Sequence, residues 1–180
     1  MTNRRETLYR RSIRLPDHDY SQPGAYFVTI VAYKHICIFG EAAHECIQLS
    51  EIGRVVESTW CEIPMHFQNV SNEHFLIMPN HLHGIIIIEN PPDRARHAAP
   101  LPQFNISSQK SNPSTLGTIV GSFKSAVTKT IHQINGLEDI KVWQRNFDEH
   151  IIRDEQEYRS IVNYIMTNPM NWENDPEYVI

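Results

Sequence analysis

Runs of apolar residues, separated by residues that break helices and strands, predict the first elements of this chain. The segment AYFVTIVAYK, residues 25–34, is rich in aromatic and β-branched residues and follows a proline-glycine pair, so it predicts a strand. Residues 49–67 then place apolar side chains at helical spacing after Ser50, a residue type that caps helix N-termini, and the pattern stops at Pro64. This spacing predicts an amphipathic helix packed against a sheet.

The remaining apolar pattern predicts a hairpin, two more helices and one more strand. Two short apolar runs, residues 73–79 and 83–90, flank a tight Pro-Asn turn and predict the hairpin. Residues 114–136 and 154–172 carry apolar stripes at helical spacing, and residues 141–153 have the composition of a strand. The order strand, helix, hairpin, helix, strand, helix predicts an α+β ferredoxin-like (RRM-like) sandwich, in which an antiparallel sheet has helices on one face and an added C-terminal helix.

Length and composition predict one domain that spans residues 1–180. The chain has 180 residues, of which 41% are hydrophobic, and this is enough for one core. Residues 91–113 are polar and proline-rich without periodicity, so we expect a mobile surface insertion there. No run approaches the roughly 20 apolar residues of a membrane helix, and the first residues lack the apolar centre of a signal peptide. We therefore expect a cytoplasmic protein.

Charge is distributed unevenly along the chain. The formal net charge of −5 and the pI near 6.0 argue against a broad basic surface for nucleic acid. Within residues 1–20, however, five arginines oppose a single glutamate in the first fourteen positions: Arg4, Arg5, Arg10, Arg11 and Arg14. Such a run fits either a solvated tail or a flexible arm that follows a phosphate backbone. Lys124, near the polar side of the second helix, and Arg145 are further candidates for phosphate contact.

Two histidines lie one residue apart at the start of an otherwise apolar strand. Because side chains alternate across a strand, His81 and His83 project from one face and Leu82 from the other. Two imidazoles on one face can bind one metal ion and leave positions open for a carboxylate or amide oxygen and for substrate phosphate. The pair alone also fits an ordinary polar strand end.

A tyrosine and an asparagine share one face of the C-terminal helix. Tyr164 and Asn168 have i, i+4 spacing, which places them one turn apart, while Tyr158 is a competing candidate for any tyrosine chemistry. A tyrosine in an apolar helix is more often a core residue. A phenol, with a pKa of about 10, is a poor nucleophile at neutral pH. A metal ion that polarises a phosphodiester would make its attack feasible and yield a phosphotyrosine ester.

Three segments together resemble the REP-associated tyrosine transposases, relatives of the one-tyrosine transposases that move single-stranded insertion sequences. The segments are RRSIRLPDHDYSQPGAYFVTI, MPNHLHGIIII and VWQRNFDEHIIRDEQEYRSIVNYIMTNPMNW. The resemblance extends from Arg10 to Trp172, apart from the proline-rich insertion. It implies the same ferredoxin-like fold and metal-dependent nicking of single-stranded DNA near imperfect hairpins, with a 5′-phosphotyrosine and a free 3′-OH as products.

The resemblance also implies roles for individual residues. His81 and His83 match the histidine-hydrophobic-histidine signature that binds the catalytic divalent metal, expected to be Mg²⁺ or Mn²⁺. Tyr164, and not Tyr158, matches the nucleophile in its Y-x-x-x-N-P setting, and Asn168 matches a position that can complete the metal site. The expected partner is single-stranded or hairpin DNA, and a monomer is favoured over a homodimer.

Three alternatives to a transposase-like enzyme stay open from the sequence. The first is a protein derived from such a transposase that binds hairpin DNA without cutting it. The second is an iron or zinc enzyme for a small molecule, whose third ligand would be Glu149, Asp148 or Glu89. The third is a purely structural role for the histidines and the tyrosine.

Overall fold

Residues 22–43, 46–90, 115–134 and 136–178 are described in a computed structural model of the chain. The predicted basic arm, with its five arginines, and the whole of the predicted proline-rich insertion lie outside these residues. The elements, in chain order, are β1 (Gly24–Val31), η1 (Tyr33–His35), β2 (Gly40–Ala43), β3 (Cys46–Leu49), α1 (Glu51–Cys61), α2 (Ile63–His66), β4 (Val70–Ser71), β5 (Phe75–Ile77), β6 (His81–Ile88), α3 (Leu116–Ile131), β7 (Asp148–Ile152), α4 (Glu155–Thr167) and η2 (Asn168–Asn174).

The main sheet is antiparallel and has the strand order of a ferredoxin-like sandwich. β6 and β1 pair along their full lengths in its centre, from Gly24 opposite Ile88 to Val31 opposite His81. β7 pairs with the other edge of β1, and β4 and β5 pair successively with the other edge of β6. The α+β ferredoxin-like class predicted from the sequence is confirmed.

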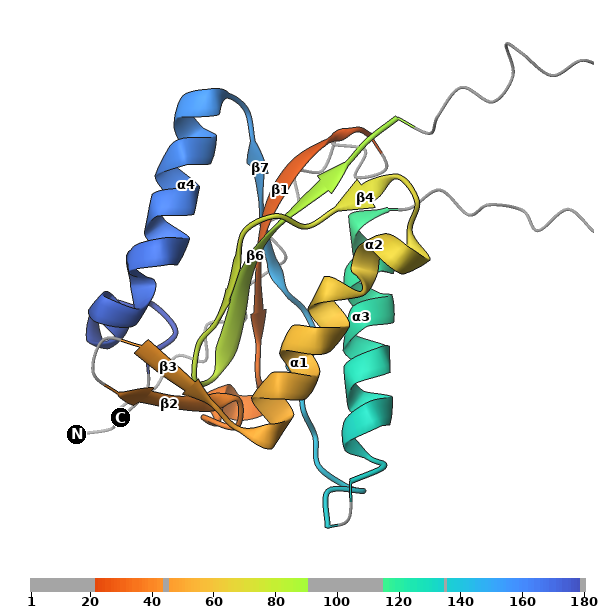
Figure 1. The fold of residues 1–180 in the computed structure, drawn as a ribbon, viewed down its shortest axis with the longest axis vertical. Coiled ribbons are helices and arrows are strands. Elements are labelled where there is room, and N and C mark those ends of the chain that lie inside the picture. The colour runs from red at the N-terminus through yellow and green to blue at the C-terminus, as the bar shows by residue number, and fades with distance from the viewer. Residues whose placement is uncertain (1–21, 44–45, 91–114, 135, 179–180) are drawn as a thin grey trace, which may run out of the picture.

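Helices cover both faces of this sheet. Figure 1 shows α1 and α3 side by side on one face, with α4 on the opposite face. Between the sheet and the α1–α3 layer lies the main core, where Trp60 of α1 meets Phe123 of α3 edge to face at 5.2 Å between ring centroids. Alternation along β6 sends Leu82 and Ile86 into this core, so His81 and His83 face α4.

A glycine in the central strand makes room for the largest core side chain. An added Cβ at Gly84 would overlap the ring of Trp60, which is fully buried. The backbone of β6 and α1 can therefore approach closely only with glycine at this position. The histidine strand is thereby packed against the core one residue after His83.

Besides the short strand β4, the structure differs from the predicted elements in three places. Residues 40–49 form the β2–β3 hairpin, which the sequence pattern did not predict. The predicted strand at 141–153 is regular only from Asp148, and before it Trp143 makes one isolated bridge to Ala32. The first predicted helix is divided after Cys61, and Pro64 lies in the first turn of the short α2. The Ser50 cap is confirmed, since its side chain accepts from the Gly53 N–H at 3.0 Å.

The described helices also bear on membrane insertion. Within the residue ranges given above, no helix is long and apolar enough to cross a membrane.

Candidate active site

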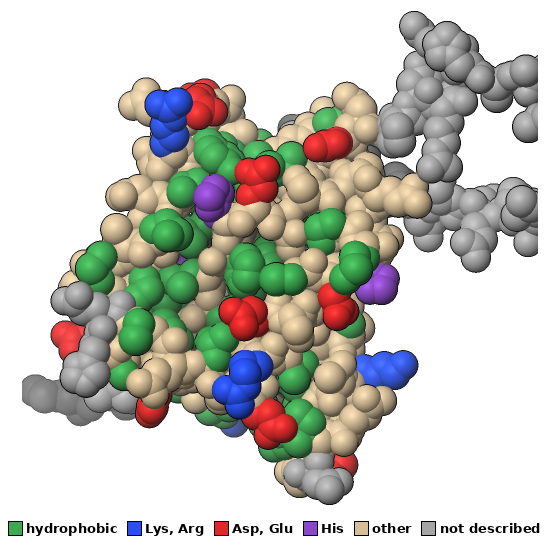
Figure 2. Space-filling view, viewed as in Figure 1, with side chains coloured by type: hydrophobic (Ala, Val, Ile, Leu, Met, Phe, Trp, Pro, Cys, Tyr) green, Lys and Arg blue, Asp and Glu red, His purple; other side chains and the backbone are tan. Residues whose placement is uncertain are grey.

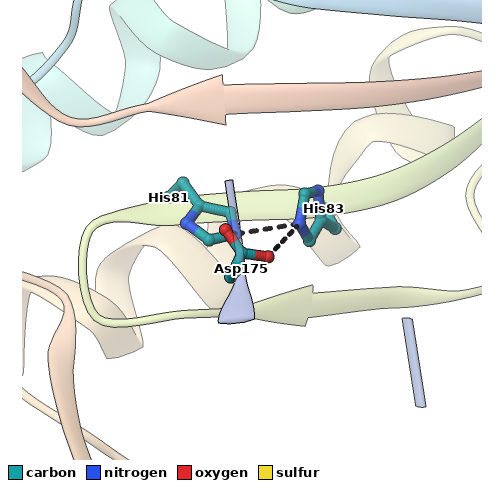
Figure 3. Close-up of side chains that lie close together, drawn as sticks. All are labelled: His81, His83 and Asp175. Atoms are coloured by element: carbon teal, nitrogen blue, oxygen red, sulfur yellow. Dashed lines mark hydrogen bonds and ion pairs between the residues drawn. The ribbon is translucent and has the colours of Figure 1, made fainter. Parts of the chain in front are cut away.

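His81 and His83 lie buried on the α4 face of the central strand. Their Nε2 atoms are 2.9 Å apart, and the two side chains project from β6 in the same direction, as Figure 3 shows. The Nδ1 atom of His83 contacts the Thr29 hydroxyl at 2.9 Å, and that of His81 contacts the Asn80 amide oxygen at 2.8 Å. Since both outer nitrogens are occupied, both Nε2 atoms point into the space beneath α4.

Asp175 is the third member of the cluster, and the sequence analysis missed it. The chain turns back after α4 through η2 and brings the Asp175 carboxylate against both histidines (Figure 3). Its Oδ2 atom is 3.4 Å from His83 Nε2, and its Oδ1 atom is 3.8 Å from His81 Nε2. In the sequence the only signal is an acidic residue before a proline, seven positions after Asn168, and this pattern alone does not indicate a ligand.

The structure brings Tyr164 and Asn168 to the same carboxylate. The Tyr164 hydroxyl donates to Asp175 Oδ2 at 3.0 Å and lies 3.2 Å from His83 Nε2. The Asn168 amide nitrogen donates to the same oxygen at 2.7 Å. Tyr164 is 37% exposed and Asn168 is buried, so the phenol is within reach of a ligand in solvent while the amide is not. Tyr164 and Asn168 thus share one face of the C-terminal helical segment, as predicted, and this face covers the two histidines.

The electrostatic environment keeps His81 neutral, the Asp175 carboxyl ionised and the Tyr164 phenol protonated. Burial, with a smaller effect of His83, lowers the pKa of His81 to about 3. Burial alone would raise the pKa of Asp175, but hydrogen bonds from His83 and Asn168 outweigh it and hold this pKa well below its usual range. Burial and the Asp175 charge raise the pKa of Tyr164 well above its usual range. The phenol is therefore a weak nucleophile unless positive charge is added nearby.

The cluster fits a divalent metal ion. Ligand atoms of His81, His83 and Asp175 all lie within 4.8 Å of one another. The Asn168 Oδ1 atom is buried and has no hydrogen-bond partner among the described residues, so a fourth oxygen is available. The Nε2 atoms of the two histidines are 2.9 Å apart, so both would be able to reach one ion.

Other candidate residues lie away from this cluster. The Tyr158 hydroxyl donates to Glu73 at 2.8 Å, and burial together with Glu73 raises its pKa to about 12. Of the alternative third ligands, Glu149 pairs with Val28 of β1, and this register turns its side chain to the α1–α3 face of the sheet. Asp148 shares the histidine face but lies on β7, which β1 separates from β6, and Glu89 follows the end of β6. Neither residue belongs to the cluster.

Lys124 and Arg145 lie together on the α3 side of the sheet. They line one groove between α3 and the segment before β7. The Lys124 ammonium donates to the backbone carbonyl oxygens of residues 144, 145 and 146, at 2.6, 3.3 and 3.2 Å. Burial lowers the pKa of Lys124 to about 8. Lys124 therefore holds the loop that presents the exposed Arg145.

Fold and site together define a class: a ferredoxin-like protein with a buried His-His-Asp group beneath a tyrosine helix. Among solved structures, a REP-associated tyrosine transposase bound to a REP hairpin has this fold, with a TM-score of 0.57 and 15% identity over 86% of this chain and 72% of that one. At 15% identity, this similarity shows that the two chains share a fold. No family model matches the chain. An uncharacterized protein of Haemophilus influenzae is 43% identical over 172 residues, which cover 95% of this chain and 94% of that protein, and the chain belongs to the family of this protein.

Proposed function

We propose that the protein is a metal-dependent, transposase-like enzyme that nicks and rejoins single-stranded DNA near hairpins through Tyr164. The observation that carries the proposal is the convergence of Tyr164, His83 and Asp175, whose reactive atoms lie 3.0 to 3.4 Å apart. A core tyrosine does not require a buried carboxylate and an imidazole at its hydroxyl. The transposase of like fold, which is bound to hairpin DNA, supports the choice of substrate.

In the proposed reaction, His81, His83 and Asp175 hold Mg²⁺ or Mn²⁺, and Asn168 supplies a further oxygen. The ion would withdraw charge from the phosphoryl oxygens and favour in-line displacement at phosphorus. The Tyr164 oxygen forms a bond to phosphorus while the bond from phosphorus to O3′ breaks. The phenol loses a proton and the O3′ gains one, so the products are a 5′-phosphotyrosine ester and a 3′-hydroxyl. Attack of a 3′-hydroxyl on the ester reverses these bonds and rejoins DNA.

DNA contacts outside the reacting atoms are proposed for the basic residues singled out in the sequence. Arg145 is exposed on the groove beside α3, and Lys124 fixes its loop and adds charge there. The arginines at positions 4, 5, 10, 11 and 14 are proposed to follow the phosphate backbone as an arm. On the face shown in Figure 2, the described lysine and arginine side chains are few and lie apart, so this face offers no continuous basic patch.

The catalytic groups all belong to one chain, and this favours a monomer. The Tyr164 hydroxyl reaches His83 and Asp175 of its own chain. We therefore propose that the tyrosine acts on the metal site of the same subunit, without exchange of α4 between subunits.

The experiment that tests this function is a denaturing gel of labelled single-stranded oligonucleotides that span hairpins beside the gene, after incubation with protein and Mn²⁺. A covalent protein–DNA band is expected for the wild type and for Tyr158→Phe, the matched control, but not for Tyr164→Phe or with EDTA. A band that persists in Tyr164→Phe would refute the assignment of the nucleophile. If the wild type forms no band but shifts hairpin DNA on a native gel, the non-cutting DNA-binding protein is the correct alternative.

A further inference from the structure

The side chain of Asn80 is fully buried in the turn between β5 and β6 and contacts three separate segments. Its Nδ2 atom donates to the Glu177 carbonyl oxygen at 2.7 Å and to the His35 carbonyl oxygen at 3.3 Å. Its Oδ1 atom lies 2.8 Å from His81 Nδ1. One amide thus joins the first histidine of the site, the C-terminal segment and the turn after β1.

These partners determine which nitrogen of His81 carries the proton. Two carbonyl oxygens can only accept hydrogen bonds, so the NH₂ group of Asn80 must face them and its oxygen must face His81. Because that oxygen also only accepts, His81 Nδ1 must be the N–H donor. A neutral imidazole has a single N–H, so the Nε2 atom of His81 presents a lone pair to the site. This is the form of imidazole that binds a metal ion.

The same amide positions the C-terminal segment. The Glu177 N–H donates to Asp175 Oδ1 at 2.7 Å, and the Glu177 carbonyl oxygen accepts from Asn80. The backbone of Glu177 thus links Asn80 to Asp175. The Glu177 carboxylate also lies 3.2 Å from His35 Nδ1. Asp175, which follows the last helix, is thereby tied to the turn immediately before His81.

The turn after β1 adopts a backbone conformation that needs such support. Lys34 and His35 have φ values of 55° and 57°, in the left-handed region that non-glycine residues seldom adopt. Such a conformation is strained and persists only where surrounding contacts hold it. The bond from Asn80 to the His35 carbonyl is one of these contacts.

We propose that Asn80 is a positioning residue that fixes the metal-binding tautomer of His81 and ties Asp175 to β6, so that both halves of the site are formed before the ion arrives. Thr29 cannot impose a tautomer on His83 in this way, because a hydroxyl both donates and accepts. The proposal rests on the proposed function only in that the cluster binds a divalent ion. The tautomer itself belongs to the metal-free protein.

The first test is a titration of the protein with Mn²⁺ alone, in which electron paramagnetic resonance measures the free and bound ion. Asn80→Ala is expected to weaken Mn²⁺ affinity by about 10- to 100-fold, as loss of a partner behind a metal ligand does. Asn72→Ala is the matched control, because it removes another asparagine that donates to a backbone carbonyl, that of Trp60, away from the cluster. The control should lower thermal stability and leave Mn²⁺ affinity unchanged. Unchanged affinity in a folded Asn80→Ala protein would overturn the proposal.

The second test is ¹⁵N–¹H NMR of histidine-labelled, metal-free protein, with the His81 signals identified by their absence in His81→Gln. The wild type is expected to show the proton of His81 on Nδ1, and Asn80→Asp, which keeps the accepting oxygen, should preserve it. A proton on Nε2 in the wild type would refute the proposal even if Asn80→Ala does not fold. If the wild type binds no Mn²⁺, the proposed enzyme function is wrong. The position of the His81 proton would still show whether Asn80 fixes the tautomer.

Discussion

Asp175 is the residue on which the chemistry of the site converges. Its carboxylate accepts from the Tyr164 hydroxyl and the Asn168 amide and lies against both histidines. It therefore has two effects: it supplies the negative charge that a divalent ion needs, and it raises the pKa of the phenol while no ion is present. Under the proposed function, Asp175 both favours metal binding and keeps the Tyr164 phenol protonated while no ion is bound.

Replacement of Asp175 should change both the metal affinity and the pKa of Tyr164. In Asp175→Asn, we expect Mn²⁺ affinity to fall by about 100-fold or more, because the charged ligand is lost, and the pKa of Tyr164 to fall towards its usual value. Calorimetric titration with Mn²⁺ and ultraviolet titration of tyrosinate measure the two changes. Glu173→Gln is the matched control, since it removes an exposed carboxylate from the same segment. Equal Mn²⁺ affinity in the two variants would rule out Asp175 as a ligand.

At the residue scale, the sequence predicted the parts of the site that depend on local geometry. The period of a strand puts His81 and His83 on one face, and the period of a helix puts Tyr164 and Asn168 on another, whatever the rest of the chain does. The position of Asp175 depends instead on the path of η2 after α4, and no local periodicity encodes that path. The sequence could therefore predict four of these residues and not the fifth.

At the scale of elements, β6 joins the core to the site. Its even-numbered side chains pack into the α1–α3 core and its odd-numbered histidines face α4, so strain on one face is transmitted to the other. Gly84 is the point of closest approach, because Trp60 occupies the space that a side chain would need. The strand that carries His81 and His83 is thus fixed by packing on its opposite side.

Two glycine substitutions should change the unfolding free energy in opposite directions. Gly84→Ala should destabilise the protein by roughly 1–3 kcal/mol, because the new methyl group displaces the Trp60 ring. Gly121→Ala, in the exposed part of α3 where an added Cβ meets nothing within 4 Å, should stabilise it by about 1 kcal/mol. Urea unfolding followed by circular dichroism measures both changes. A Gly84→Ala protein as stable as the wild type would contradict the described contact between β6 and α1.

The predicted elements also show where sequence patterns are insufficient. Long apolar stripes predicted α1, α3 and α4, since burial of one helix face leaves a clear period. The β2–β3 hairpin has only four residues in each strand. β2 shows no alternation, and the alternation of β3, in which Ile47 and Leu49 are half-buried, is too short to be distinctive. Residues 141–147 have strand-like composition but are held by the Lys124 ammonium and one bridge at Trp143, contacts that no local pattern predicts.

At the scale of the whole molecule, a net charge of −5 means that DNA affinity cannot come from a general positive potential. On the face of Figure 2 the described basic side chains are separated and acidic ones lie among them. Under the proposed function, affinity must come from local contacts and from the metal ion. DNA affinity should accordingly depend on an intact His81–His83–Asp175 cluster and on the pH of the solution.

The buried histidine gives a measurable pH dependence of global stability. His81 has a pKa of about 3 in the folded, metal-free protein, against about 6.5 in the unfolded chain. Between these values only the unfolded chain binds the proton, so the contribution of His81 to the unfolding free energy should fall by about 1.4 kcal/mol per pH unit as pH drops from 6 to 4. Denaturant unfolding in EDTA should show a shallower pH dependence for His81→Gln. Identical slopes for wild type and variant would show that His81 is not held neutral.

The most direct test of the central claim is mass spectrometry of the protein after reaction with single-stranded hairpin DNA and Mn²⁺, followed by nuclease and protease digestion. We predict a peptide in which Tyr164 carries a nucleotide through a phosphodiester bond, absent when metal is withheld and absent in His83→Ala. A nucleotide on Tyr158, or on any residue other than Tyr164, would refute the proposed reaction. So would modification of Tyr164 that proceeds equally well in EDTA.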